Sequence, residues 1–163
     1  MADVQVKQSD NTMILSKEFD APRTLVFEMF KNPEHLASWW GPTGMPATIV
    51  SFDFSPGGVW HYYMQGPDGT KYWGKATFKE IDEPNSLSYI DVFSDEAGTV
   101  NPDLPQGLTL VTFDEHDGKT TLRMVGEYQN AEEIEKLTEM GMIEGVTDTW
   151  NQLEALIEKH KTL

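Results

Sequence analysis

Residues 131–160 read AEEIEKLTEMGMIEGVTDTWNQLEALIEKH, and the spacing of their apolar side chains decides the fold class. Apolar residues recur three or four positions apart, which is the spacing along one face of a helix. The stretch therefore predicts one main amphipathic helix after a short first segment, and Gly141 and Gly145 either bend the helix or let it lie close to a strand. The apolar positions are Ile134, Leu137, Met140 or Gly141, Ile143, Val146, Trp150, Leu153 and Ile157.

The opposite face of this helix is acidic. A solvated face is the simplest interpretation of such a charge pattern, and a docking surface for a partner protein is the alternative. The acidic positions are Glu132, Glu133, Glu135, Glu139, Glu144, Asp148 and Glu158.

Upstream of this helix, seven segments are rich in β-branched and aromatic residues and predict strands. The segments SPGG, GPDG, DEPN and EHDG lie between several of them and have the composition of turns. The predicted strands cover residues 12–19, 47–54, 58–65, 71–81, 86–93, 108–114 and 119–128.

Two short helices are predicted after the first strand. Pro22 lies near the start of the first helix, and Asn32 ends it because a residue before proline disfavours helical backbone. The second helix runs to Trp39. One strand, two helices, six strands and a long helix indicate an α+β fold with an antiparallel sheet of about seven strands. One long helix cannot cover such a sheet, so large side chains or a cavity must fill the space between them.

Five motifs spread along the chain carry a family resemblance. They are W-W-G-P at 39–42, D-F-x-P-G-G-x-W at 53–60, M-x-G-P-D-G at 64–69, E-I-x-x-P at 80–84 and G-M-x-x-G at 141–145. Together they resemble the domain named for the activator of the heat shock protein 90 ATPase, within the START-like or SRPBCC superfamily. The resemblance implies a helix-grip fold, in which a curved sheet wraps the C-terminal helix around an apolar cavity. We expect residues 1–163 to form one such domain, with its core at about 12–160.

Two positions depart from the family pattern. Ser55 stands where arginine is usual, which removes a positive charge near the edge of the sheet. Val146 stands where tryptophan is common, which enlarges or reshapes the cavity that the resemblance implies, with Trp150 as a candidate to compensate.

Aromatic and methionine side chains alternate along several of the predicted strands. They could form an aromatic core, or they could line a pocket, since methionine adapts to irregular ligands. The candidate ligand-binding residues are Trp40, Phe52, Trp60, Tyr62, Met64, Tyr89, Phe93, Met124, Met140, Ile143 and Trp150.

The segment WWGPTG at residues 39–44 ends the second short helix. Adjacent helical positions point about 100° apart, so two neighbouring tryptophans cannot serve one purpose. We expect Trp39 to pack against Phe27 or Phe30, and Trp40 to face the mouth of the cavity near Trp60. Gly41 and Pro42 then let the chain turn sharply away.

The sequence offers no catalytic residue and no metal or cofactor site. It has no cysteine, and its four histidines are scattered without the spacing of metal ligands. Asp53 and Glu80 lie in apolar strands, where an edge carboxylate is the ordinary interpretation and a pocket acid with a raised pKa is the alternative.

Composition excludes several classes of partner. The formal net charge is −15, from 27 acidic and 12 basic residues, which disfavours nucleic acid and anionic membrane surfaces. The first ten residues, MADVQVKQSD, carry no apolar signal-like run, and no segment approaches the length of a membrane span. We expect a cytoplasmic protein, either a monomer or a homodimer.

These observations order three functional hypotheses. The first is a binding module for a small hydrophobic molecule that is lipid-, polyketide- or aromatic-like. The second is a co-chaperone-like interaction domain, which predicts an exposed apolar patch outside the cavity. The third is a cyclase- or hydrolase-type enzyme, which predicts an ionisable pair within hydrogen-bond reach inside the cavity.

Overall fold

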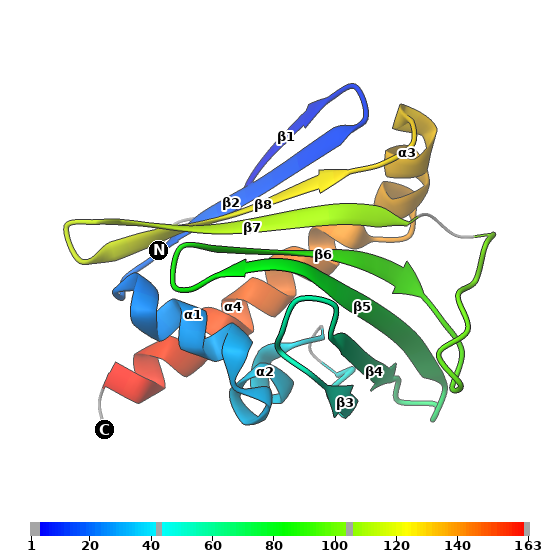
Figure 1. Cartoon of the computed structure of the whole chain (residues 1–163), viewed down its shortest axis with the longest axis horizontal. Helices are drawn as coiled ribbons and strands as arrows, with labels where there is room; N and C mark the ends of the chain where they lie inside the picture. Colours follow the sequence, from blue (N-terminus) through cyan, green and yellow to red (C-terminus); the bar gives the residue numbers. More distant parts are fainter. Residues whose placement is uncertain (1–3, 42–43, 104–105, 162–163) are drawn as a thin grey trace.

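The computed structural model describes residues 4–41, 44–103 and 106–161, and within them eight strands form one antiparallel sheet (Figure 1). The spatial order is β1-β2-β8-β7-β6-β5-β4-β3, so the first two strands pair with the last two. The strands are β1 (Gln5–Ser9), β2 (Thr12–Phe19), β3 (Ala47–Phe52), β4 (Val59–Gln65), β5 (Lys71–Asp82), β6 (Ser86–Phe93), β7 (Gly107–His116) and β8 (Lys119–Glu127).

The seven strands expected from the sequence are present, and the α+β prediction is confirmed. The additional strand is β1, the outermost strand of the sheet, whose residues QVKQS are exposed along their whole length. It pairs with β2 across a tight turn at Asp10, which adopts a positive φ of 54°. Because β1 buries none of its own residues, it lacks the apolar alternation that predicts a strand.

The two short helices are α1 (Arg23–Lys31) and α2 (Pro33–Trp39). Asn32 separates them and caps α2, because its side-chain oxygen accepts a hydrogen bond from the backbone N–H of Glu34 at 3.0 Å. Pro33 occupies the first turn of α2, where a missing N–H costs no helical hydrogen bond.

The C-terminal segment forms a short helix, α3 (Ala131–Glu139), followed by the long helix α4 (Met142–Lys161), so the expected long C-terminal helix is confirmed. Gly141 lies between them with a φ of 90°, a backbone conformation that glycine adopts without strain. In Figure 1, α4 crosses one face of the sheet, with α1 and α2 beside its C-terminal half and α3 beside the far end of β8.

Helices α1 and α4 pack against the same face of the sheet, which we call the inner face. Phe27 of α1 lies 5.0 Å from Phe113 of β7 between ring centroids, and Trp150 of α4 lies 6.3 Å from Phe19 of β2. All four side chains are almost fully buried, so the α1 end of this interface is solid.

The outer face of the sheet carries apolar side chains that no described helix covers. Leu108 and Leu110 of β7 are each 41% exposed, and the strand register places Ile90, Val125 and Ile14 beside them on neighbouring strands. We call these five residues the outer apolar patch.

A candidate binding cavity

A cavity of about 500 Å³ lies between the inner face of the sheet and helices α3 and α4. Strands β4 to β8 form one wall, the two C-terminal helices form the opposite wall, and the segment after α2 contributes Trp40, Gly41 and Met45. Tyr72 and Met140 also line the cavity, and each is about half exposed to solvent, at 52% and 53%. They mark the side on which the cavity reaches the surface.

Space remains between the sheet and the helices here because small residues occupy neighbouring positions on the inner face of the sheet. The strand register aligns Ala76, Asp91 and Gly107 across β5, β6 and β7, so both neighbours of Asp91 are small. On the opposite wall, α4 contributes Gly145, where an added Cβ would meet no atom within 4 Å. Small residues on both walls therefore leave the space that large side chains fill elsewhere in the core.

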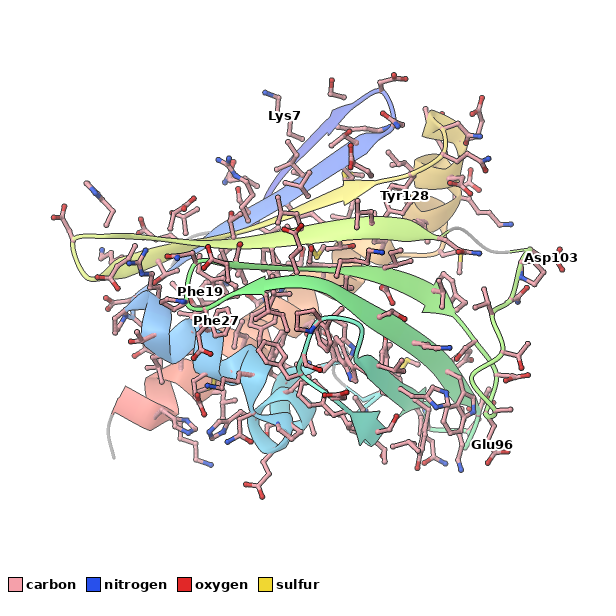
Figure 2. All side chains as sticks on the ribbon, in the orientation of Figure 1. Lys7, Phe19, Phe27, Glu96, Asp103 and Tyr128 are labelled. Carbon is pink, nitrogen blue, oxygen red and sulfur yellow. The ribbon has the colours of Figure 1, made fainter. Side chains whose placement is uncertain are left out.

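Two tyrosine rings lie directly over glycines of the sheet. A Cβ added at Gly74 would stand 2.6 Å from the ring of Tyr62, and one added at Gly107 would stand 2.6 Å from the ring of Tyr128. Real Cβ atoms do not approach other atoms so closely, so the two glycines allow the rings to lie flat along the cavity wall. Figure 2 shows Tyr128 where β8 ends, beside α3.

The two tryptophans at the end of α2 point in different directions, as expected. Trp39 is completely buried, packs 4.9 Å from the ring of Phe30, and donates a hydrogen bond from its indole N–H to the carbonyl of Met29 at 3.0 Å. Trp40 lines the cavity and lies 4.6 Å from the ring of Trp60. Pro42, where the chain is expected to turn away, lies outside the described residues.

The residue after Trp40 is anchored to α4, whereas the indole N–H of Trp40 itself is unpaired. The carbonyl of Gly41 accepts a hydrogen bond from the side-chain amide of Gln152 on α4 at 2.6 Å, which ties this corner to the helix. The indole N–H of Trp40 is buried without a hydrogen-bond partner among the described residues. It lies near the Tyr62 hydroxyl and opposes part of the rise in the pKa of Tyr62, but the two groups do not have the geometry of a hydrogen bond.

Asp91 is the one carboxyl among the described residues that line the cavity. Its side chain is half-buried and lines the cavity. Burial raises the pKa of Asp91 from 3.8 to about 7, and the nearby backbone N–H of Val92 opposes part of the shift. Near neutral pH this side chain is therefore present in both its protonated and its ionised form.

Three tyrosines share the cavity with Asp91. Burial, and secondarily the charge of Asp91, raises the pKa of Tyr62 and Tyr89 well above their usual value and that of Tyr128 to about 12. All three hydroxyls consequently stay protonated at neutral pH. No described hydrogen bond joins Asp91 to another side chain, so the ionisable pair expected of an enzyme is absent from the described part of the cavity.

The structure brings most of the candidate residues from the sequence to the cavity wall. Whether they bind a ligand stays a prediction. Those at the wall are Trp40, Tyr62, Met64, Tyr89, Phe93, Met124, Met140 and Trp150.

Three candidates do not line the cavity. Trp60 is buried behind Trp40, and Phe52 packs 6.1 Å from Trp60 in the adjoining aromatic core. Ile143 is also absent from the lining, although Met142, Gly145, Val146, Thr149 and Trp150 of the same helix line the cavity.

Sequence reasoning missed Asp91 and examined Asp53 and Glu80, which are exposed. The strand SLSYIDVF contained the signal, because Asp91 shares the parity of Leu87, Tyr89 and Phe93 and therefore faces inward with them. Asp53 accepts a hydrogen bond from Ser55 at 2.8 Å, so the serine that replaces arginine forms a local turn contact.

The other features examined in the sequence contribute little to the cavity. His61 is buried away from it, with its ring 4.9 Å from that of Trp73. The described residues contain no group of three or more potential metal ligands. Val146, the second departure from the family pattern, lines the cavity. None of the described helices is both long enough and apolar enough to span a bilayer.

Comparison with known proteins supports the fold and the family. The model of the family described as activator of Hsp90 ATPase homolog 1-like protein matches residues 20–158. The chain belongs to this family. The resemblance seen in its motifs is thereby confirmed, and the curved sheet around the C-terminal helix is the helix-grip fold.

Similar solved structures come from several bacteria. Protein Ms6760 from Mycobacterium smegmatis is 42% identical, with a TM-score of 0.87 over 94% of this chain and 96% of that one. A protein from Arthrobacter aurescens is 32% identical, with a TM-score of 0.90 over 95% and 91%. One from Staphylococcus epidermidis is 26% identical, with a TM-score of 0.85 over 96% and 94%. The comparison with curated proteins found no match.

Proposed function

We propose that this member of the family of activator of Hsp90 ATPase homolog 1-like proteins is a binding module for a small hydrophobic molecule. The observation that carries the proposal is the cavity of about 500 Å³. Its size falls within the range of roughly 300–1,000 Å³ that is usual for small-molecule sites, and its lining is mostly apolar with few polar groups. We further propose that residues 1–163 act as a single domain.

The composition of the cavity wall suits an apolar ligand of irregular shape. Met45, Met64, Met124, Met140 and Met142 all line it, and flexible thioether chains repack around a ligand at low cost. Aromatic rings of Trp40, Tyr62, Tyr89 and Trp150 supply rigid flat surfaces between them. An aromatic or polycyclic body would use both kinds of surface.

The test fills the cavity from the helix side. A Cβ at Gly145 meets nothing within 4 Å, so Gly145→Phe places a ring in the empty space. We expect this variant to fold and to lose at least about tenfold in affinity for Nile red, a neutral apolar dye, measured by fluorescence titration. Ala155→Phe adds the same ring at an exposed position of α4 and should bind the dye like the parent.

The outcome that contradicts the proposal is equally concrete. Unchanged dye binding by Gly145→Phe would place the dye on the surface rather than in the cavity. Native mass spectrometry of the protein purified from its own host provides an independent check, because a cavity ligand should copurify with the parent and be missing from Gly145→Phe.

A co-chaperone-like function is the second candidate, and the outer apolar patch favours it. Exposed apolar side chains on an uncovered sheet face commonly mark a protein interface. If this function holds, Leu108→Lys with Leu110→Lys should abolish stimulation of an Hsp90 ATPase, whereas Gly145→Phe should leave it intact. Failure of the parent protein to stimulate the ATPase would exclude this candidate.

A further inference from the structure

We propose that Asp91 makes the cavity selective for hydrophobic amines, with the carboxylate receiving the protonated amino group and the aromatic and methionine side chains surrounding the apolar body. This inference rests on the proposed function, and it adds the chemical class of the ligand. It also assigns a role to an inward-facing acid that the fold itself does not require.

The charges of the cavity wall exclude the opposite class of ligand. The described lining contains Asp91 and no lysine, arginine or histidine. A carboxylate or phosphate ligand would therefore lose its hydration without gaining a cationic partner, and it would lie near an acid of the same charge. A protonated amine gains an ion pair in the same place.

Another inward-facing charge of the sheet, Lys17, provides a contrast. Lys17 of β2 is 2% exposed, and its ammonium group donates to the side-chain carbonyl of Asn151 at 2.9 Å and lies 3.5 Å from a carboxylate oxygen of Glu154. Both partners come from α4, so this charge is satisfied within the fold. Among the described residues Asp91 has no cationic partner and no hydrogen bond from another side chain, only the nearby backbone N–H of Val92, and it faces the cavity.

The surroundings of Asp91 also favour a cation. Rings of Tyr62, Tyr89, Tyr128 and Trp40 line the same cavity, and the face of an aromatic ring attracts an ammonium group. The net charge of −15 draws cations toward the protein from a distance. Short-range and long-range electrostatics therefore act in the same direction.

Binding of an amine should depend on pH through Asp91. The other titratable groups of the described lining are Tyr62 on β4, Tyr72 on β5, Tyr89 on β6 and Tyr128 after β8, while α3, α4 and β7 contribute no titratable side chain. Glu133 of α3 acts on Tyr128 from nearby. In the empty cavity the pKa of Asp91 is about 7, so below neutral pH the carboxyl must lose a proton before it pairs with an ammonium group.

The experiment compares three ligands that share one apolar body: naphthylmethylamine, naphthylmethanol and naphthoate. Isothermal titration calorimetry at about pH 8 should give the amine about tenfold higher affinity than the alcohol, with naphthoate the weakest. Asp91→Asn should reduce amine affinity by about tenfold and change alcohol affinity less than about threefold. Asp114→Asn removes the same charge from an exposed position of β7 and should change neither.

A second measurement needs no substitution. For the parent protein, amine affinity should fall about tenfold or more from about pH 8 to about pH 5.5, while alcohol affinity should stay constant. Equal binding of the three ligands, or an amine affinity independent of both pH and Asp91, would overturn the inference and leave the proposed function standing. Failure of all three ligands to bind would overturn both.

Discussion

The space between the sheet and α4 has two ends that are built from the same kinds of residue, yet one is filled and the other is hollow. At the α1 end, the ring of Phe27 lies 5.0 Å from that of Phe113, and each side chain is 1% exposed. At the α3 end, Tyr62, Tyr89 and Tyr128 stand around the cavity. Figure 2 shows Phe19 and Phe27 at the first end and Tyr128 at the second.

The difference lies in what covers and separates the rings. Helix α1 lies over the filled end (Figure 1) and packs the ring of Phe27 against that of Phe113 on the sheet. At the hollow end, Gly141 interrupts the helical segment between α3 and α4. Gly74 and Gly107 on the sheet and Gly145 on α4 add no side-chain volume to the two walls. Aromatic content alone therefore does not predict a cavity. The positions of small residues and helix breaks decide whether rings fill a space or line it.

The largest expected effect distinguishes the two adjacent tryptophans that lie at the boundary of these ends. Trp39→Ala should lower the free energy of unfolding by about 3–5 kcal/mol, because it removes a fully buried ring and leaves the Met29 carbonyl without its donor. Trp40→Ala should lower it clearly less, since one side of that ring faces the cavity, and should change Nile red binding. Urea denaturation and dye titration of both variants measure these effects.

The two results are informative together. Equal destabilisation with unchanged dye binding would mean that both tryptophans are ordinary core residues, and the division between filled and hollow ends would not pass between them. A loss of dye binding in Trp39→Ala alone would reverse their assigned positions.

Most of the fold could be predicted from the sequence, because the apolar residues recur regularly along its strands and helices. The strand 12–19 and the break at Asn32-Pro33 were placed correctly, since alternation and proline act locally. Strand β1 was missed because an exposed edge strand has no buried face. The division of the C-terminal segment at Gly141 was only partly foreseen, because glycine permits a positive φ without requiring one.

The candidate site was harder to predict than the fold, because a cavity forms where adjacent elements lack large side chains. Trp60 and Tyr62 share a strand face, yet Trp60 is buried behind Trp40 while Tyr62 lines the cavity. Sequence parity cannot separate such positions, because the separation comes from the strand register and from the helix across the sheet. The alternation of the strand predicts that Asp91 faces inward. That it lacks a side-chain partner depends on its small neighbours on the adjacent strands, Ala76 and Gly107.

The second effect concerns the carboxyl that the hollow end leaves unpaired. Its pKa rises from 3.8 in the unfolded chain to about 7 in the fold, so between these values the folded state holds a proton that the unfolded state has lost. Stability therefore falls as pH rises from about 4 to about 7 and levels off above. Asp91→Asn removes this dependence and should add on the order of 2 to 4 kcal/mol to the free energy of unfolding at about pH 8.

Denaturant titrations of the parent and Asp91→Asn between about pH 5.5 and about pH 8 measure this difference. It should grow toward neutral pH, whereas Asp114→Asn at an exposed position should follow the parent. A difference that stays constant with pH would show that Asp91 is ionised throughout and that the cavity is better hydrated than its lining indicates.

The smallest effects come from adding one methyl group to each wall of the hollow end. At Gly74 the new Cβ meets the Tyr62 ring at 2.6 Å, and Trp40 and Trp60 enclose that ring, so Gly74→Ala should cost about 1–3 kcal/mol. At Gly145 the new Cβ meets nothing within 4 Å, so Gly145→Ala should gain about 0.5–1 kcal/mol from helix propensity. Urea midpoints compare the two variants, and a loss at Gly145 as large as at Gly74 would mean that α4 closes against the sheet and that this end is not hollow.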